Sequence, residues 1–163
     1  MRRIMGAIVL AFLSTAPVVH AQVTAATAQS VQKQLEPLFA EMLVAANAHD
    51  TDRFMALYRR RDPSFVFVFN GTIMNGWDAA HAQQLKWWNN GKSDVVYKYS
   101  SPPEITVLGP DAAVVTQPIS ATRTLPDGKT STGEIVATTV WKKFPEGWRG
   151  VQVHESVAAP PQR

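Results

Sequence analysis

The chain has 163 residues, of which 45% are hydrophobic and 18% charged, with 16 Lys or Arg, 13 Asp or Glu and no Cys. This length fits one domain with one hydrophobic core, and this hydrophobic content excludes a largely disordered chain. The lack of cysteine excludes a disulfide scaffold, a thiolate metal site, a cysteine nucleophile and a lipid-anchored lipoprotein.

The first 21 residues have the three parts of a secretory signal peptide. Arg2 and Arg3 form the positive region, residues 4–13 the apolar run, and Val19 and Ala21 are the small residues that a signal peptidase reads. The apolar run is too short for a membrane span, which needs about 20 residues. We therefore predict cleavage near Ala21 and a periplasmic or secreted protein.

Three segments follow from this interpretation: a signal peptide over 1–21, one domain over 22–157 and a flexible tail over 158–163. No later apolar run is long enough to span a membrane. Cleavage removes two arginines and leaves only one more basic than acidic residue. Because nucleic-acid binding relies on a dense cationic face, and the chain has only the cluster Arg59-Arg60-Arg61, we expect no nucleic-acid partner.

The mature chain begins with helical patterns. From Ser30 to about His49, apolar residues recur at three- and four-residue steps, at Val31, Leu35, Leu38, Phe39, Met42 and Ala46. Pro37 interrupts this stripe, so the helix either kinks there or begins there. Asp50 is expected to cap a second helix over 51–58, with Phe54, Leu57 and Tyr58 on its inner face.

A hairpin and a third helix come next. Residues 65–69 alternate like a strand, Asn70-Gly71 is a strong hairpin signal, and 72–74 would return. Asn75 could cap a helix over about 76–89. On that helix Trp77, His81, Gln84 and Trp88 share one stripe, so His81 could face the interior.

The rest of the chain is β. Strands are predicted over 94–100, 104–108, 112–124, 131–144 and 148–157, separated by Gly- and Pro-containing turns. This order predicts an α+β fold in which three helices of the N-terminal half pack on a strongly curved antiparallel sheet. Such a cone-shaped roll leaves a hollow between its layers, and apolar hollows are common ligand sites.

Two segments carry a resemblance to a known family. Residues 45–58, AANAHDTDRFMALY, resemble the helix-to-helix signature of the nuclear transport factor 2-like superfamily, and the segments 139–143, 147–149 and 152–156 resemble its closing hairpin. The resemblance spans Val31 to Val157 and is close to small SnoaL-like and DUF4440-type single-domain members. It implies a cystatin-like cone, on which enzymes, ligand binders and assembly domains all occur.

The resemblance disfavours one enzyme mechanism. Similar steroid isomerases carry a tyrosine and two aspartates at positions that fall near Met42, Phe67 and Thr139 here. Proton abstraction beside a carbonyl needs a positioned titratable group, and only Thr139 could donate even a hydrogen bond. Dehydratase-like chemistry would instead need a histidine in the hollow, for which His81 is the candidate.

Residues of the last strand alternate between two faces. Val151, Val153 and Glu155 share one, and Gln152 and His154 share the other. Similar kinase association domains have a pocket-facing polar residue at the position of Glu155 and outward-facing residues at the other two. By that resemblance Glu155 points into the hollow, Thr139 joins it from the neighbouring strand, and Trp88 closes the mouth. Those domains have arginines at the positions of Glu155 and Thr139, which would make their pockets suited to anions. Because this chain has a glutamate and a threonine instead, we do not expect its pocket to bind anions.

A carboxylate in such a hollow would be poorly solvated, which raises its pKa. Glu155 would then be a general acid or base, or a contact for a cationic or hydroxylated ligand. The alternative is an exposed glutamate at a strand end, or one paired with Arg123 or Arg149.

The sequence favours a small-molecule-binding domain that forms a homodimer through the outer sheet face, with Gln152 and His154 in the interface. The ligand would be apolar or hydroxylated, and its contacts are predicted to be Tyr58, Phe67, Trp77, Gln84, Trp88, Thr139, Val153 and Glu155. Two alternatives stay open: an enzyme of the cyclase, dehydratase or isomerase type with Glu155 as acid or base and His81 assisting, or a structural assembly domain. Because no metal-ligand spacing, phosphate-binding loop or nucleophile elbow occurs, we expect no metal and no cofactor.

Overall fold

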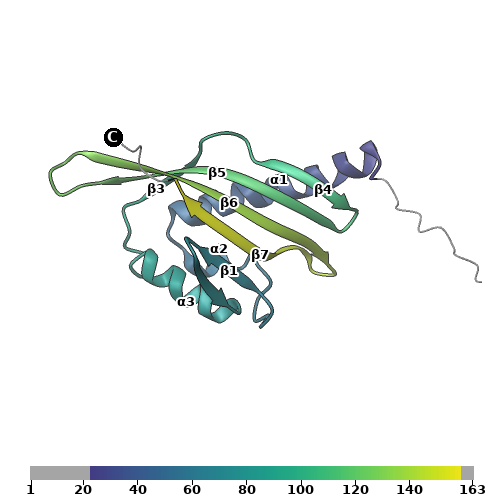
Figure 1. The fold of residues 1–163 in the computed structure, drawn as a ribbon, viewed down its shortest axis with the longest axis horizontal. Coiled ribbons are helices and arrows are strands. Elements are labelled where there is room, and N and C mark those ends of the chain that lie inside the picture. The colour runs from purple at the N-terminus through teal and green to yellow at the C-terminus, as the bar shows by residue number, and fades with distance from the viewer. Residues whose placement is uncertain (1–22, 159–163) are drawn as a thin grey trace, which may run out of the picture.

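The computed structural model describes residues 23–158, and within this range the chain forms three helices and one seven-stranded sheet (Figure 1). The helices are α1 (Ala25–Asn47), α2 (Thr51–Met55) and α3 (Trp77–Trp87). The strands are β1 (Val66–Phe69), β2 (Thr72–Asn75), β3 (Val96–Tyr99), β4 (Glu104–Gly109), β5 (Ala112–Thr124), β6 (Thr130–Phe144) and β7 (Gly147–Val157). The predicted signal peptide and residues 159–163 of the predicted tail lie outside the described residues.

Helix α1 begins earlier than its apolar stripe predicts. Thr24 caps it, because its Oγ1 accepts a hydrogen bond from the Thr27 amide at 3.1 Å. Pro37 therefore lies inside the helix, and the alternative that the helix begins there is wrong. The predicted stripe is the buried face of the helix, with Val31, Leu35, Phe39 and Met42 in the core.

Helix α2 begins at the predicted cap but ends three residues early. The Asp50 carboxylate accepts a hydrogen bond from the Arg53 amide at 3.0 Å. After Met55 the backbone pairs with β7 instead of continuing the helix: the Gly150 amide donates to the Leu57 carbonyl at 3.0 Å. The Tyr58 ring then packs directly over Gly150, where a Cβ atom would lie 2.5 Å from the ring. Only glycine leaves room for this contact.

The hairpin forms as predicted, and the cap of α3 does not. Asn70 and Gly71 have φ angles of 44° and 81°, the left-handed values that a tight turn between β1 and β2 requires. Asn75, however, is the last residue of β2 and pairs with Val66. Gly76 takes the N-cap position of α3, with a φ of 86° and no side-chain hydrogen bond. The prediction that Asn75 caps this helix is wrong.

The sheet has the order β2-β1-β7-β6-β5, and both β3 and β4 pair along β5. Every pair of strands is antiparallel except β1 with β7, which are parallel. The sheet is therefore mixed, whereas the sequence predicted an antiparallel one. These two strands are far apart in the sequence, and no tight turn constrains them to run in opposite directions. Pro118 lies in β5 between the part that pairs with β4 and the part that pairs with β3. A missing N–H is tolerated at such a position.

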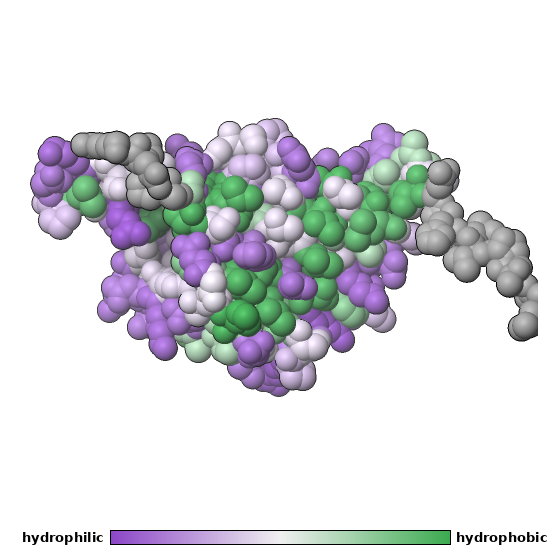
Figure 2. Space-filling view, viewed as in Figure 1, coloured by the Kyte–Doolittle hydropathy of each residue, from purple (hydrophilic) through white to green (hydrophobic). Residues whose placement is uncertain are grey.

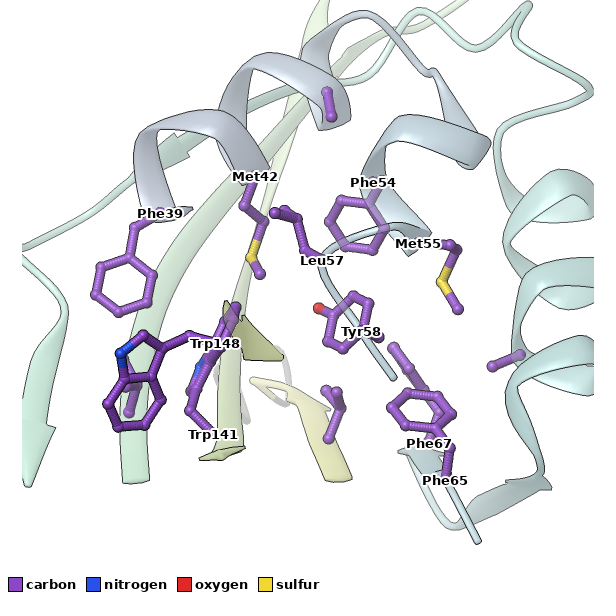
Figure 3. Close-up of a cluster of buried hydrophobic side chains, with 14 of the residues drawn as sticks. Phe39, Met42, Phe54, Met55, Leu57, Tyr58, Phe65, Phe67, Trp141 and Trp148 are labelled. Carbon is purple, nitrogen blue, oxygen red and sulfur yellow. The ribbon is translucent and has the colours of Figure 1, made fainter. Parts of the chain in front are cut away.

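The helices cover one face of the curved sheet, and the other face is not covered by a helix (Figure 1). The core between the two layers is rich in aromatic side chains, including Phe39, Tyr58, Phe65, Phe67 and Trp141 (Figure 3). The α+β roll of three helices on a curved sheet is therefore confirmed.

Candidate functional site

A cavity of about 570 Å³ lies between the helices and the curved sheet. This volume is in the range of small-molecule sites, which are roughly 300–1,000 Å³. Its lining includes residues of α1, α2, α3, β1 and the last three strands. One side is open, because the lining residues Arg123, Leu125 and Ser131 are exposed to solvent.

The floor of the cavity is formed by two neighbouring rows of paired strand residues. In the first row Phe69 pairs with Glu155, Glu155 with Ala137, and Ala137 with Gln117. In the second row Val157 pairs with Ile135, and Ile135 with Ile119. Paired residues point to the same face of a sheet. The carboxyl of Glu155 therefore leaves the sheet among apolar side chains, with Gln117 as the other polar residue of the two rows.

Aromatic side chains from both layers surround this floor. We call them the aromatic wall, and they are Phe54, Tyr58, Phe69, Trp87, Trp88, Tyr97 and Tyr99. Several are in direct ring contact: the centroids of Phe54 and Trp88 are 5.1 Å apart, and those of Phe69 and Trp87 are 4.9 Å apart. Edge-to-face and tilted contacts at such distances stabilise the arrangement and hold the rings in place.

Hydrogen bonds orient the polar ends of the wall. The Trp88 indole N–H donates to the Tyr97 hydroxyl at 3.0 Å. The Gln117 amide donates to the Tyr99 hydroxyl at 3.0 Å, and that hydroxyl donates to the Phe39 carbonyl of α1 at 3.0 Å. In the described residues the Tyr58 hydroxyl has no such partner. Tyr58 and Tyr97 each therefore keep a hydroxyl proton that a ligand could accept.

Glu155 is the acidic residue of the cavity lining. Within residues 23–158 its carboxylate forms no ion pair and no hydrogen bond, so neither predicted alternative partner is engaged. Arg123 is exposed at the open side of the cavity, and Arg149 donates to the Trp148 carbonyl at 2.7 Å. Burial without a counter-charge raises the pKa of Glu155 from 4.5 to about 7.

The charge of Glu155 also acts on two tyrosines of the wall. Burial raises the pKa of Tyr58 well above its ordinary value, and the nearby carboxylate adds to this. Burial likewise raises the pKa of Tyr97, with a further contribution from Glu155. These effects indicate that the carboxyl and both phenols share one poorly solvated space. At neutral pH the phenols stay protonated, and Glu155 is the group that changes its charge.

Four of the predicted contact residues meet in the cavity, namely Tyr58, Gln84, Trp88 and Glu155. Phe67, Val153 and Thr139 do not line it: they form the adjacent row of the sheet, deeper in the core and fully buried. The strand register explains the difference. Ala137, and not Thr139, is the neighbour of Glu155 on β6.

Trp77 and His81 lie away from the cavity, on the first turns of α3. The Trp77 indole N–H donates to the Met55 carbonyl at 2.9 Å, so this end of the helix packs against α2. The His81 ring stacks on Trp77, and its Nε2 is 2.7 Å from the exposed Asp52 carboxylate. His81 is thus not placed to assist a reaction in the cavity. Only the later turns of α3, with Gln84 and Trp87, and the following residue Trp88 reach the lining.

The predicted contacts did not include five members of the aromatic wall or the polar residue of the floor: Phe54, Phe69, Trp87, Tyr97, Tyr99 and Gln117. A signal for the two tyrosines exists, because they alternate within a predicted strand and must share one face. Nothing in the sequence distinguishes Gln117 from an exposed strand residue.

No group of three or more His, Asp or Glu side chains in residues 23–158 is arranged to hold a metal ion. None of the helices between Val23 and Ala158 is long and apolar enough to cross a membrane.

Comparisons with known proteins agree with this architecture. An NTF-2 like protein from Shewanella oneidensis MR-1 is 26% identical, with 77% of this chain and 98% of that chain covered and a TM-score of 0.63. An NTF2-like superfamily protein from Salmonella enterica serovar Typhimurium is 25% identical over 85% of this chain and 95% of that chain, with a TM-score of 0.64. The association domain of C. elegans CaMKII is 20% identical over 80% of this chain and 98% of that chain, with a TM-score of 0.65.

No curated protein matches the chain. The family model of the SnoaL-like domain matches residues 35–160, which include all the strands and both sides of the cavity. The chain therefore belongs to the SnoaL-like domain family, within the NTF2-like superfamily.

Proposed function

We propose that this protein binds a small, largely apolar molecule between its helices and its sheet, with Glu155 as the main polar contact. The observation that carries the proposal is a carboxyl group without a partner among the described residues, on the floor of an apolar cavity of about 570 Å³. Glu155 is half-buried, and an unpaired carboxylate with restricted access to water is unfavourable, so a ligand that pairs with it gains affinity. The protonated hydroxyls of Tyr58 and Tyr97 offer further contacts to a hydroxylated ligand.

Native mass spectrometry of protein purified from its own host tests this function. We expect a co-purifying small molecule that is retained by the wild type and by the control variant Glu104→Gln, whose site is exposed on β4. The isosteric change Glu155→Gln should weaken the capture. Equal capture by Glu155→Gln and the wild type would contradict the assignment of the site.

One observation favours an enzyme as the second candidate. A carboxyl with a pKa of about 7 is suited to donate or accept a proton at neutral pH. In a cyclase, dehydratase or isomerase reaction Glu155 would move the proton, and the Tyr58 and Tyr97 hydroxyls would stabilise negative charge on a substrate oxygen. Such an activity should follow the ionisation of Glu155 and be lost in Glu155→Gln. A structural assembly domain with a filled, vestigial hollow is disfavoured, because side chains leave a cavity of about 570 Å³ between the two layers.

We also propose that the protein forms a homodimer through the outer face of its sheet. Figure 2 shows hydrophobic residues gathered on this face, and the register places Val68, Val136 and Val140 on the same side as the exposed Gln152 and His154. An apolar sheet face of this kind is typical of an interface. The kinship to an association domain is a second argument.

Sedimentation measurements test the dimer. Val136, which is 43% exposed on β6, is replaced by lysine, and Val44, 50% exposed on α1, provides the matched control. We expect Val136→Lys to shift the protein to a monomer and Val44→Lys to leave the dimer intact. A monomeric wild type would refute the proposal.

Export is proposed from the N-terminal sequence, where Arg2 and Arg3 precede an apolar run and the expected cleavage site at Ala21. The intact mass of the protein from its host should correspond to a chain that begins near Gln22. A chain that retains its first residues would contradict cleavage.

A further inference from the structure

Charge is distributed unevenly around the cavity. Of the lining residues in the described chain, only Arg123 and Glu155 are charged. Arg123 is exposed to solvent at the open side, where water screens it, whereas Glu155 lies on the floor without an ion pair. The interior of the cavity therefore has one acidic group and no buried cation to balance it.

The cavity around this carboxyl is lined by aromatic side chains. Phe69 is the direct strand neighbour of Glu155, and its ring is 4.9 Å from that of Trp87. On the helix side, Phe54 contacts both Tyr58, at 5.6 Å, and Trp88, at 5.1 Å. The face of an aromatic ring carries negative partial charge and attracts cations, most strongly in a site from which water is excluded.

We propose that the ligand is an organic ammonium ion, that is, an apolar amine or a quaternary ammonium compound. Its cation would lie against Glu155 inside the aromatic wall. This inference rests on the proposed binding function. A cation supplies the counter-charge that the floor lacks, and the rings stabilise the same charge. A neutral ligand would satisfy the apolar walls but leave the carboxylate uncompensated. An anionic ligand would be repelled.

Other titratable groups face the cavity from several elements. Tyr58 follows α2, Tyr97 and Tyr99 come from β3, and the pKa of each is raised by burial, so all three stay neutral near pH 7. His49 follows α1 and lies behind the lining residues: its ring is 5.8 Å from that of Trp88, and its Nε2 is 2.9 Å from the Val95 carbonyl oxygen. His49 is the histidine that packs against the aromatic wall, so the test has to separate its contribution from that of Glu155.

The experiment compares two probes of nearly equal shape, benzyltrimethylammonium and its uncharged carbon analogue neopentylbenzene. Binding to the full chain is followed by the fluorescence of the tryptophans, two of which, Trp87 and Trp88, line the cavity. At pH 8 we expect the cation to bind at least about tenfold more tightly than the neutral probe. At pH 5.5 Glu155 is mostly protonated, so the affinity of the cation should fall by about tenfold, whereas the affinity of the neutral probe should stay the same.

The variant Glu155→Gln keeps His49 and removes only the carboxyl. It should bind both probes with similar affinity and without a pH dependence. A pH dependence that persists in this variant would belong to another group and would overturn the inference. If the neutral probe binds the wild type at pH 8 as tightly as the cation, the ammonium ligand is refuted and the apolar binding function stands. If neither probe binds, both proposals fail.

Discussion

Replacement of Glu155 by glutamine should change how the stability of the protein depends on pH. In the folded protein burial raises the pKa of Glu155 from 4.5 to about 7, whereas in the unfolded chain the group titrates near its ordinary value. Between these two values the folded state holds a proton that the unfolded state releases. The wild type therefore loses stability as the pH rises from about 4.5 to about 7, and Glu155→Gln does not.

The size of this loss follows from the difference between the two pKa values. One pKa unit corresponds to about 1.4 kcal/mol, so the full difference is about 3 kcal/mol. Glu155 retains some contact with the open side of the cavity, and we expect about 1–3 kcal/mol after allowance for solvent screening. Glu155→Gln should match the wild type near pH 4.5 and exceed it by this amount at pH 8.

Urea denaturation at a series of pH values measures the effect. Glu104→Gln makes the same chemical change at an exposed position of β4 and should leave the pH dependence of the wild type unchanged. If the free energies of unfolding of Glu155→Gln and the wild type stay parallel from pH 4.5 to pH 8, Glu155 is solvated and the reasoning fails.

Three further substitutions test the structure around the cavity. Gly150→Ala forces a Cβ atom into the ring of Tyr58 and should lower the free energy of unfolding by about 1–3 kcal/mol; Gly133→Ala, with no atom within 4 Å of the added Cβ, is the control and should have little effect. Tyr99→Phe removes the hydroxyl that connects β3 to α1 and β5, and should cost about 1–2 kcal/mol in urea denaturation; an unchanged midpoint would show that this hydrogen bond contributes nothing. His81→Ala should leave probe binding unchanged, because the ring stacks outside the cavity; weakened binding would place His81 in the site.

Much of the fold could be predicted from local patterns. The stripe on α1, the cap at Asp50, the Asn70-Gly71 turn and the long strands at the end of the chain each depend on neighbouring residues. The predictions that were wrong concern positions where tertiary contacts determine the local structure. Asn75 does not cap α3 because it is paired with β1, and α2 ends at Met55 because the chain turns to β7.

The site could be predicted only in part. The alternation of β7 places Val153 and Glu155 on one face, and a sequence shows that directly. It does not show the register between strands, which brings Ala137 instead of Thr139 beside Glu155. The packing of α3 is equally non-local. Trp77 and Trp88 share a stripe in the sequence, yet only Trp88 reaches the cavity, because the first turn of the helix packs against α2.

The carboxyl of Glu155 faces a poorly solvated cavity, with nothing in the described chain to pair with it. A carbon-13 NMR titration of this carboxyl, assigned by comparison with Glu155→Gln, tests the claim directly. We predict a titration midpoint near pH 7 in the protein without added ligand. A midpoint near pH 4.5 would show a solvated carboxylate and contradict the account.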